Sequence, residues 1–197
     1  MNQPAHSLPP QYFEQVYAAN ADPWQFATSP YERDKYAATL AALPNALYAS
    51  GFEIGCSIGI LTAQLATRCQ ELLAVDVSEA ALQQARQRLV GQPQVRIENR
   101  QIPADFPRET FDLILLSEVG YYWSRADLAV AKEQMLAQLR PGGHLLLVHW
   151  TPPVADYPLT GDDVHESFLE HTGEGKPLLH RQSDRHETYR LDLFERV

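Results

Sequence analysis

The chain has 197 residues, enough for one domain with a hydrophobic core and too few for two domains of ordinary size. Hydrophobic residues make up 45% of it and charged residues 21%, which excludes a largely disordered protein. The formal net charge of −9, with no run of Lys or Arg, argues against nucleic acid as a partner.

Cysteine content and targeting signals favour a cytoplasmic protein. Cys56 and Cys69 are the only cysteines, and they indicate neither a disulfide framework nor a metal site. The N-terminus lacks the basic flank and apolar stretch of a signal peptide, and no segment reaches the roughly 18 apolar residues of a membrane span. We therefore expect no membrane contact, while the oligomeric state stays unknown.

The N-terminal part is predicted to be helical. Residues 1–10 carry three prolines and should form a loose arm. Apolar residues then recur at three- and four-residue spacing, which predicts a short helix that ends at Asp22-Pro23. A second helix should begin at Ser29, a good N-cap followed by Pro30, and end before Pro44.

From about residue 49, strands and helices alternate, which is typical of a parallel sheet with crossover helices. A turn is expected at residues 140–143. After Trp150 the pattern predicts a loop, a short helix ending at Gly173, and two antiparallel strands around residues 183–186 that close the sheet. The fold class is therefore α/β, with predicted strands at 50–54, 71–77, 94–99, 111–117 and 143–150, and predicted helices at 59–68, 79–90 and 126–139.

A glycine-rich turn, Glu53-x-Gly55-x-Ser57-x-Gly59, joins the first of these strands to a helix. Glycine permits positive φ and close approach of a ligand to the main chain. The spacing differs from the G-x-G-x-x-G of dinucleotide sites, and Glu53 would repel a diphosphate but suit a cationic ligand. Asp76, at the end of the next strand, could accept hydrogen bonds from both hydroxyls of a ribose. These features disfavour a nicotinamide-dependent oxidoreductase.

The turn and its two acids resemble S-adenosylmethionine-dependent methyltransferases with a Rossmann-like fold. Over residues 12–148 the chain is similar to the NodS-like methyltransferases, whose named member N-methylates the terminal amino sugar of a chitooligosaccharide. The resemblance implies a seven-stranded Rossmann-like domain in residues 45–197, a helical lid in residues 1–44 and S-adenosyl-L-methionine as cofactor. It rests on the segments "DPWQFATSPYERDKYAATLAALP", "FEIGCSIGILTAQLATRC", "LLAVDVSEAAL", "FDLILLSEVGYYW" and "LRPGGHLLL".

The resemblance also implies which residues contact the cofactor, with Arg33 facing its methionine carboxylate. In the family an Asp-hydrophobe pair follows the third strand, whereas this chain has Gln101-Ile102. The side-chain carbonyl oxygen of Gln101 could still accept a hydrogen bond from the adenine amino group. The full set is Tyr31, Arg33, Glu53, Gly55, Cys56, Ser57, Gly59, Asp76, Val77, Gln101, Ile102 and Ser117.

On the acceptor side, Glu118 and His149 each follow a strand at the same edge of the sheet, which makes them candidates for the base that holds an amine. The candidates for binding the acceptor are Tyr122, Trp150, Tyr157 and His165. Most have a structural alternative: Glu118 could be a helix cap or a solvated acid, and Tyr122 could simply pack. His149 could be buried and bonded to a loop carbonyl, and His165 could be a solvated helix position. The function predicted is N-methylation of an amino sugar or oligosaccharide-like molecule, with O-methylation of a small metabolite or cofactor sensing without catalysis as alternatives.

Overall fold

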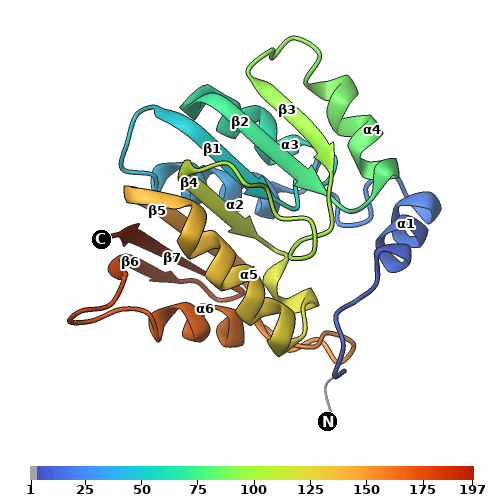
Figure 1. Ribbon diagram of the computed structural model, residues 1–197. Helices are drawn as coiled ribbons and strands as arrows, with labels where there is room; N and C mark the ends of the chain where they lie inside the picture. The colour runs from blue at the N-terminus through green and yellow to red at the C-terminus, as the bar shows by residue number, and fades with distance from the viewer. Residues whose placement is uncertain (1–3) are drawn as a thin grey trace.

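The computed structural model, which describes residues 4–197, contains a seven-stranded sheet with helices on both faces (Figure 1). The strand order is β3-β2-β1-β4-β5-β7-β6. The first five strands are parallel, and β7 is antiparallel to both β5 and β6. The predicted α/β fold and the antiparallel closing pair are confirmed. The strands are β1 (Tyr48–Ile54), β2 (Cys69–Asp76), β3 (Val95–Asn99), β4 (Phe111–Ser117), β5 (Leu139–Trp150), β6 (Leu178–Arg185) and β7 (Tyr189–Arg196).

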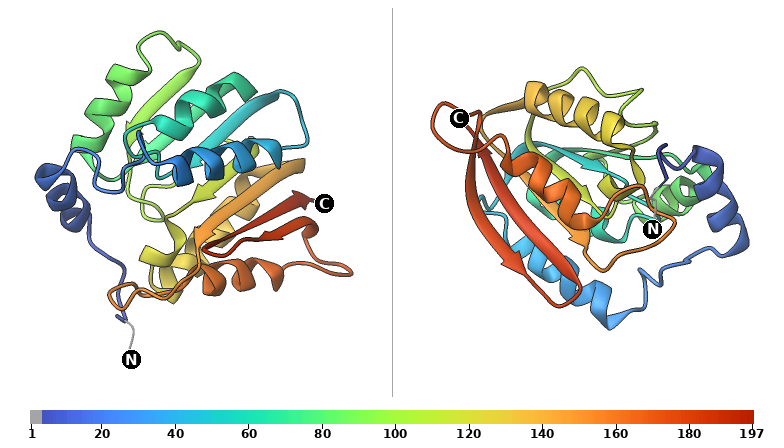
Figure 2. Two further views of the ribbon diagram at one scale, coloured as in Figure 1. Left: turned by 180° about the vertical axis from the view of Figure 1, so that it is seen from behind. Right: turned by 90° about the horizontal axis from the view of Figure 1, so that it is seen from below.

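Helices α2 and α3 cover one face of the sheet, and α5 and α6 cover the other (Figure 2). The predicted N-cap of α2 is confirmed, because the Ser29 hydroxyl accepts a hydrogen bond from the Glu32 backbone N–H. A short 3-10 helix, η1 (Ala66–Arg68), extends α3. The α-helices are α1 (Pro10–Ala19), α2 (Pro30–Ala41), α3 (Ile60–Leu65), α4 (Glu79–Arg88), α5 (Arg125–Gln138) and α6 (Gly161–Leu169).

The apolar run of β4 explains why the sheet is covered on both sides. Leu113 and Leu115 belong to the core beneath α2 and α3, whereas Ile114 and Leu116 belong to the core beneath α5 and α6. All four side chains are buried. Successive residues of a strand face opposite sides, so a continuous apolar run stabilises both layers at once.

Three predicted boundaries near the C-terminus are corrected. The turn expected at residues 140–143 lies inside β5, where the pairing with β4 shifts between Phe111 and Leu113 and Gly142 has a φ of +75°. Helix α6 ends at Leu169 rather than Gly173, and β6 continues to Arg185, so the hairpin turns at residues 186–188. In each case strand pairing or packing overrides the local turn signal.

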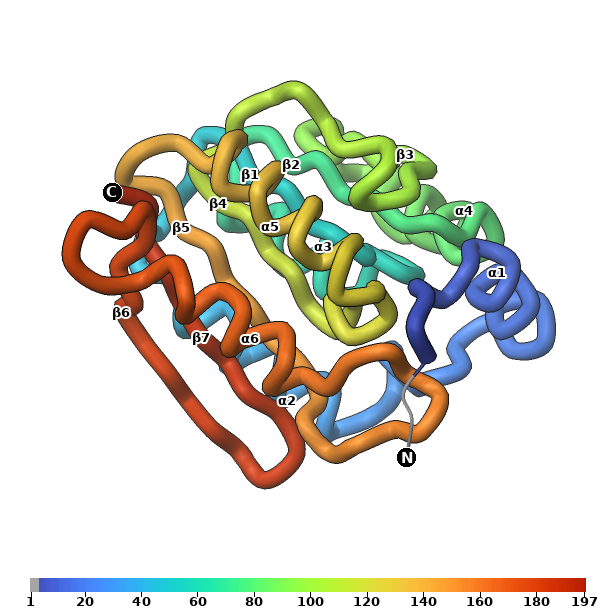
Figure 3. The backbone as a smooth tube through the Cα atoms, turned by 60° about the horizontal axis from the view of Figure 1, so that its bottom comes forward, coloured from blue at the N-terminus to red at the C-terminus, as the bar shows by residue number. Residues whose placement is uncertain are grey.

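The N-terminal segment and the loop between β5 and α6 meet at the carboxyl edge of the sheet (Figure 3). Leu8 N–H donates to the carbonyl of Tyr122, and Leu159 N–H donates to that of Tyr121. Both bonds reach η2 (Gly120–Tyr122), the 3-10 helix that follows β4. Helix α1 packs on α4. That residues 1–44 act as a lid stays a prediction; residues 1–3 of that range lie outside the described residues.

None of the helices within residues 4–197 combines the length and apolarity that a bilayer-spanning segment needs. Cys56 and Cys69 are both buried and free. Over the same residues, no group of three or more His, Cys, Asp or Glu side chains is arranged to hold a metal ion.

Candidate active site

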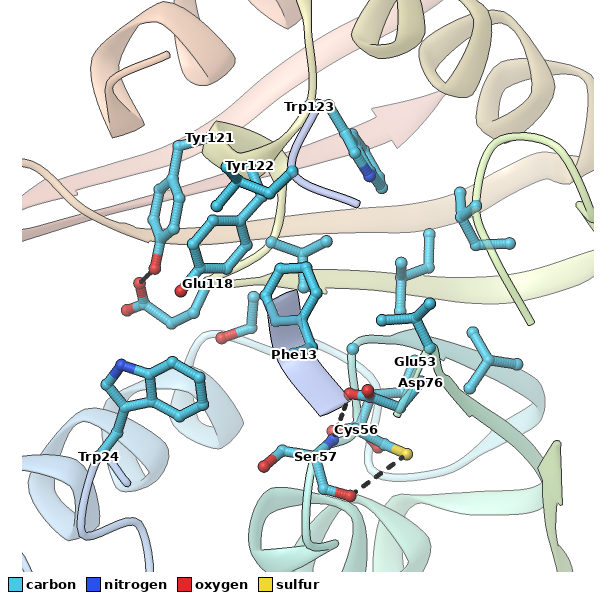
Figure 4. Close-up of a pocket in the computed structure, with 18 of the residues that line it drawn as sticks. Phe13, Trp24, Glu53, Cys56, Ser57, Asp76, Glu118, Tyr121, Tyr122 and Trp123 are labelled. Carbon is cyan, nitrogen blue, oxygen red and sulfur yellow. Dashed lines mark hydrogen bonds between the residues drawn. The ribbon is translucent and has the colours of Figure 1, made fainter. Parts of the chain in front are cut away.

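A cavity of about 920 Å³ opens at the carboxyl ends of β1, β2 and β4 (Figure 4). Its wall comes from the N-terminal helices, the strand ends, η2 and the loop after β5. This volume suits a nucleoside cofactor together with a small acceptor. The predicted site residues that line it are Tyr31, Glu53, Gly55, Cys56, Ser57, Asp76, Val77, Gln101, Ile102, Ser117, Glu118, Tyr122, Trp150 and Tyr157; Arg33, Gly59, His149 and His165 do not.

The two glycines of the turn are required for different reasons. Gly55 has a φ of +82°, and a Cβ there would lie 2.1 Å from Val119. Its backbone N–H donates to the Val75 carbonyl at 2.8 Å, which ties the turn to the end of β2. Gly59 has a φ of +79°, and a Cβ there would lie 3.0 Å from Ala85 of α4. Gly59 therefore permits close packing of α3 on α4; it does not line the cavity itself, and its contact with the cofactor stays a prediction.

Asp76 joins the glycine-rich turn to the start of α4. Its Oδ2 accepts from the Ser57 backbone N–H and its Oδ1 from the Ser78 N–H, both at 2.9 Å. Burial raises the pKa of Asp76, and these backbone bonds oppose that rise. Each carboxylate oxygen keeps a second lone pair, so the carboxylate can also accept from ligand hydroxyls. Tyr17 of α1 closes over the turn, with its hydroxyl bonded to that of Ser57.

Apart from Glu32 Oε2, which forms an ion pair with Lys35 at 3.0 Å, two buried acceptors in the cavity wall have no hydrogen-bond partner. One is Oε2 of Glu53, at the end of β1, and the other is Oε1 of Gln134, on α5. Burial raises the pKa of Glu53 to about 7; the neighbouring Thr62 hydroxyl opposes the rise, and the nearby Asp76 carboxylate adds to it. A buried acceptor without a donor is costly, so both atoms are suited to N–H donors of a ligand. The sequence did not identify Gln134, because it lies on a helix outside every motif.

A buried lysine on α2 lines the cavity beside Glu118 and was missed by the sequence analysis. Lys35 Nζ lies 2.7 Å from Glu118 Oε1 and 3.0 Å from Glu32 Oε2, and 5.1 Å from the centre of the Tyr31 ring. Burial alone would lower the pKa of Lys35, but the two carboxylates raise it. The spacing of four residues from Tyr31, on one helix face, was the available signal.

Arg33 lies on the outside of the same helix. Its side chain is 73% exposed and pairs with Asp34 at 3.1 Å. The structure does not bring it to the cavity, so its predicted contact with a cofactor carboxylate is corrected. The reason is helical register, since residues two positions apart point to nearly opposite sides.

His149 and His165 are buried in a hydrogen-bond chain behind the cavity wall. The Gly120 N–H donates to His149 Nε2 at 3.2 Å, and His149 Nδ1 lies 3.0 Å from His165 Nε2. His165 Nδ1 lies 2.5 Å from Asp192 Oδ2. The first bond requires an unprotonated Nε2, so both rings are neutral and each donates from Nδ1. Burial lowers the pKa of both histidines, and the His165–Asp192 bond opposes this for His165.

These hydrogen bonds correct the predicted roles of His149 as a base and of His165 as an acceptor contact. Both nitrogens of His149 are already bonded, and neither histidine reaches the cavity. The chain instead fixes η2, which carries Tyr121 and Tyr122.

Replacing His149 by leucine is expected to destabilise the protein by about 2 kcal/mol, because it leaves the buried Gly120 N–H and His165 Nε2 without partners. Urea unfolding measures the change. His186→Leu, on the exposed hairpin turn, is the control and should shift stability by less than about 0.5 kcal/mol. Equal losses in the two variants would count against the structural role of His149.

Aromatic side chains form the remaining wall of the cavity. Tyr31 and Trp150 meet edge to face with centroids 6.1 Å apart, and Tyr122 meets Tyr157 in the same way at 4.7 Å. Phe13 of α1 lies edge-on to Tyr122 at 4.9 Å. These rings offer flat apolar surfaces beside the Lys35 cluster.

Comparison with known proteins agrees with this geometry. The family model described as Nodulation protein S (NodS) matches residues 11–150. Nodulation protein S of Rhizobium tropici is 34% identical over 127 residues, which cover 64% of this chain and 53% of the relative. The chain spans between about half and three fifths of the length of the curated relatives it matches.

Two solved structures share the fold. The N-methyltransferase NodS from Bradyrhizobium japonicum, in complex with S-adenosyl-L-homocysteine, superposes with a TM-score of 0.83 at 27% identity, covering 94% of this chain and 97% of the other. A Pseudomonas syringae protein superposes with a TM-score of 0.73 at 39% identity, covering 84% and 99%. The Rossmann-like methyltransferase fold expected from the resemblance is thereby confirmed.

Proposed function

Since the chain belongs to the nodulation protein S (NodS) family, we propose that it is an S-adenosylmethionine-dependent methyltransferase. We propose further that it methylates nitrogen, and that the acceptor is an amino sugar or an oligosaccharide-like molecule with an amine. The relative with S-adenosyl-L-homocysteine bound, itself an N-methyltransferase, supports both the cofactor and the methylated atom.

The observation that carries the proposal is the pair of unpartnered buried acceptors in one cavity. Glu53 Oε2 would accept from the ammonium of the methionine part, and Gln134 Oε1 from the amino group of the adenine. Between them, Asp76 would accept from the ribose hydroxyls, with Val77, Gln101 and Ile102 beside the base. When bound, the cofactor supplies an electrophilic methyl group on a positively charged sulfur.

The acceptor would occupy the other end of the cavity, beside Glu118 and the aromatic wall. Tyr31 and Trp150 offer faces on which a sugar ring can stack. The two carboxylates around Lys35 leave that end without excess positive charge, so it does not repel an amine. Helix α1, through Tyr17 and Phe13, would exclude water from the reacting groups, which is the lid role proposed for residues 1–44.

Calorimetry tests the cofactor. We expect S-adenosylmethionine and S-adenosylhomocysteine to bind and NADH not to bind, because Glu53 repels a diphosphate and favours an ammonium. Binding of NADH with neither sulfur nucleoside would overturn the proposed function.

Transfer of a labelled methyl group tests the reaction, with glucosamine oligomers, other amino sugars and simple phenols as acceptors. We expect label on the amines. Label only on phenols would replace the proposal with O-methylation, and cofactor binding without any transfer would favour a sensor.

A further inference from the structure

Glu118 has a strained backbone and a carboxylate that accepts three hydrogen bonds. Its φ is +59°, in the left-handed region, and it follows directly after β4. Oε1 accepts from Lys35 Nζ at 2.7 Å, and Oε2 accepts from the Tyr121 hydroxyl at 2.6 Å and from the Trp150 N–H at 2.9 Å. These bonds tie the carboxylate to α2, to η2 and to the end of β5.

The bond from Tyr121 fixes the direction of its hydroxyl. Burial and the Glu118 charge raise the pKa of Tyr121 well above its ordinary value, so the phenol stays protonated at neutral pH. Its proton points at Glu118, which leaves only lone pairs on the oxygen for other partners. The ring is held as well, because it stacks on Tyr157 at 5.2 Å and meets His149 edge to face at 5.6 Å.

Tyr121 lines the same cavity as the glycine-rich turn. Figure 4 shows Glu118 and Tyr121 on one side and Glu53 with Asp76 on the other. An acceptor molecule that approaches the methionine end of a bound cofactor would therefore pass the Tyr121 oxygen.

We propose that the Tyr121 oxygen accepts a hydrogen bond from an N–H of the acceptor amine and thereby orients the amine for attack. Glu118, supported by Lys35, is the positioning residue that fixes the direction of the Tyr121 hydroxyl. The inference rests on the proposed function. A neutral primary amine has one lone pair and two N–H groups. With one N–H held by Tyr121, the lone pair is free to form the new C–N bond while the C–S electron pair returns to sulfur. The product is an ammonium, whose extra proton passes to water on release.

Tyr121→Phe and Tyr189→Phe form a matched pair, since each removes one hydroxyl from a buried tyrosine and keeps the ring. Tyr189 lies on β7 and does not line the cavity. We expect Tyr121→Phe to lower kcat for the amine about 30-fold, with KM within about threefold, and Tyr189→Phe to stay within about threefold in both. S-adenosylhomocysteine affinity should be unchanged in both variants, and both should be folded at the assay temperature, with Tyr121→Phe unfolding at a lower temperature because it loses the hydrogen bond to Glu118.

Glu118→Gly tests the positioning role, because glycine accepts the observed φ and Lys35 keeps Glu32 as a partner. If Glu118 acts through Tyr121, the Glu118→Gly substitution should lower kcat when it is made in the wild type. When it is made in Tyr121→Phe, it should lower kcat by less than about a further threefold. Additive losses would overturn the positioning role. Should Glu118→Gly fail to fold, the comparison of the two phenylalanine variants still decides whether the Tyr121 hydroxyl orients the amine.

The outcomes separate this inference from the proposed function. A wild-type enzyme that methylates amines while Tyr121→Phe keeps full kcat would overturn the inference alone. A wild-type protein that binds S-adenosylhomocysteine but neither methylates nor binds any amine would overturn both.

Discussion

Replacing Asp76 by alanine is expected to weaken S-adenosylhomocysteine binding about 100-fold, which is about 2.7 kcal/mol. The carboxylate has two tasks. It is placed to accept from the ribose hydroxyls, and it also accepts from the Ser57 and Ser78 N–H groups. Alanine removes the ribose contact and releases the glycine-rich turn, so part of the binding energy is lost in reordering the turn.

Isothermal calorimetry measures this loss, and Glu71→Ala is the matched control. Glu71 is an exposed carboxylate at the opposite end of the same strand, so its removal should leave the affinity within about twofold. If Asp76→Ala bound the nucleoside as tightly as the wild type, the ribose assignment would be wrong. If both variants bound it equally weakly, the loss would reflect net charge rather than the site.

The sheet and its glycine-rich turn could be predicted from the sequence because their signals are local. β2 and β4 are continuous apolar runs, and Ser29 with Pro30 marks the start of α2. The turn at residues 140–143 could not be placed correctly, because its backbone is drawn into β5 by the strands on both sides. Whether such a segment forms a turn or a strand depends on its pairing with strands that are distant in the sequence. A local sequence pattern carries no information about that pairing.

The part of the cavity wall at the strand ends was largely predictable from the sequence, and the part around Lys35 was not. Glu53 and Asp76 lie at strand ends, where topology alone brings them together. Lys35 and Glu118 are 83 residues apart, and a lysine in a helix gives no sign of a partner so distant in the sequence. The burial of His149 likewise depends on α6 and β7, which pack behind it. The misplacement of Arg33 was avoidable, since its helical spacing from Tyr31 puts it on the outer face.

Glu53→Gln is expected to stabilise the ligand-free protein and to lower its affinity for the cofactor. In the unfolded chain Glu53 ionises near its ordinary pKa of 4.5, whereas burial raises the pKa in the folded state to about 7. A raised pKa means that ionisation opposes folding: the cost is absent below pH 4.5, grows between pH 4.5 and 7 and is complete above pH 7. It should reach about 1.4 kcal/mol at about pH 5.5 and about 3 kcal/mol at about pH 8.

Urea unfolding at the two pH values measures this gain, with Glu71→Gln as the control that should show none. The neutral amide that replaces the Glu53 carboxyl avoids the ionisation cost, and Thr62 Oγ1, which is buried without a partner, can accept from it. A variant that is less stable than the wild type at both pH values would contradict the prediction, because the carboxylate would then have a partner that favours its charge.

Saturating S-adenosylhomocysteine should reverse the order of stability. In the proposed complex the nucleoside's ammonium pairs with ionised Glu53, so the wild type would gain binding energy that the variant lacks. Below pH 7 that binding must first release the Glu53 proton, and wild-type affinity should therefore be about tenfold weaker at about pH 6 than at about pH 8. Affinity in Glu53→Gln should be low and independent of pH. A wild-type affinity that does not change between these pH values would show that Glu53 does not pair with the ammonium.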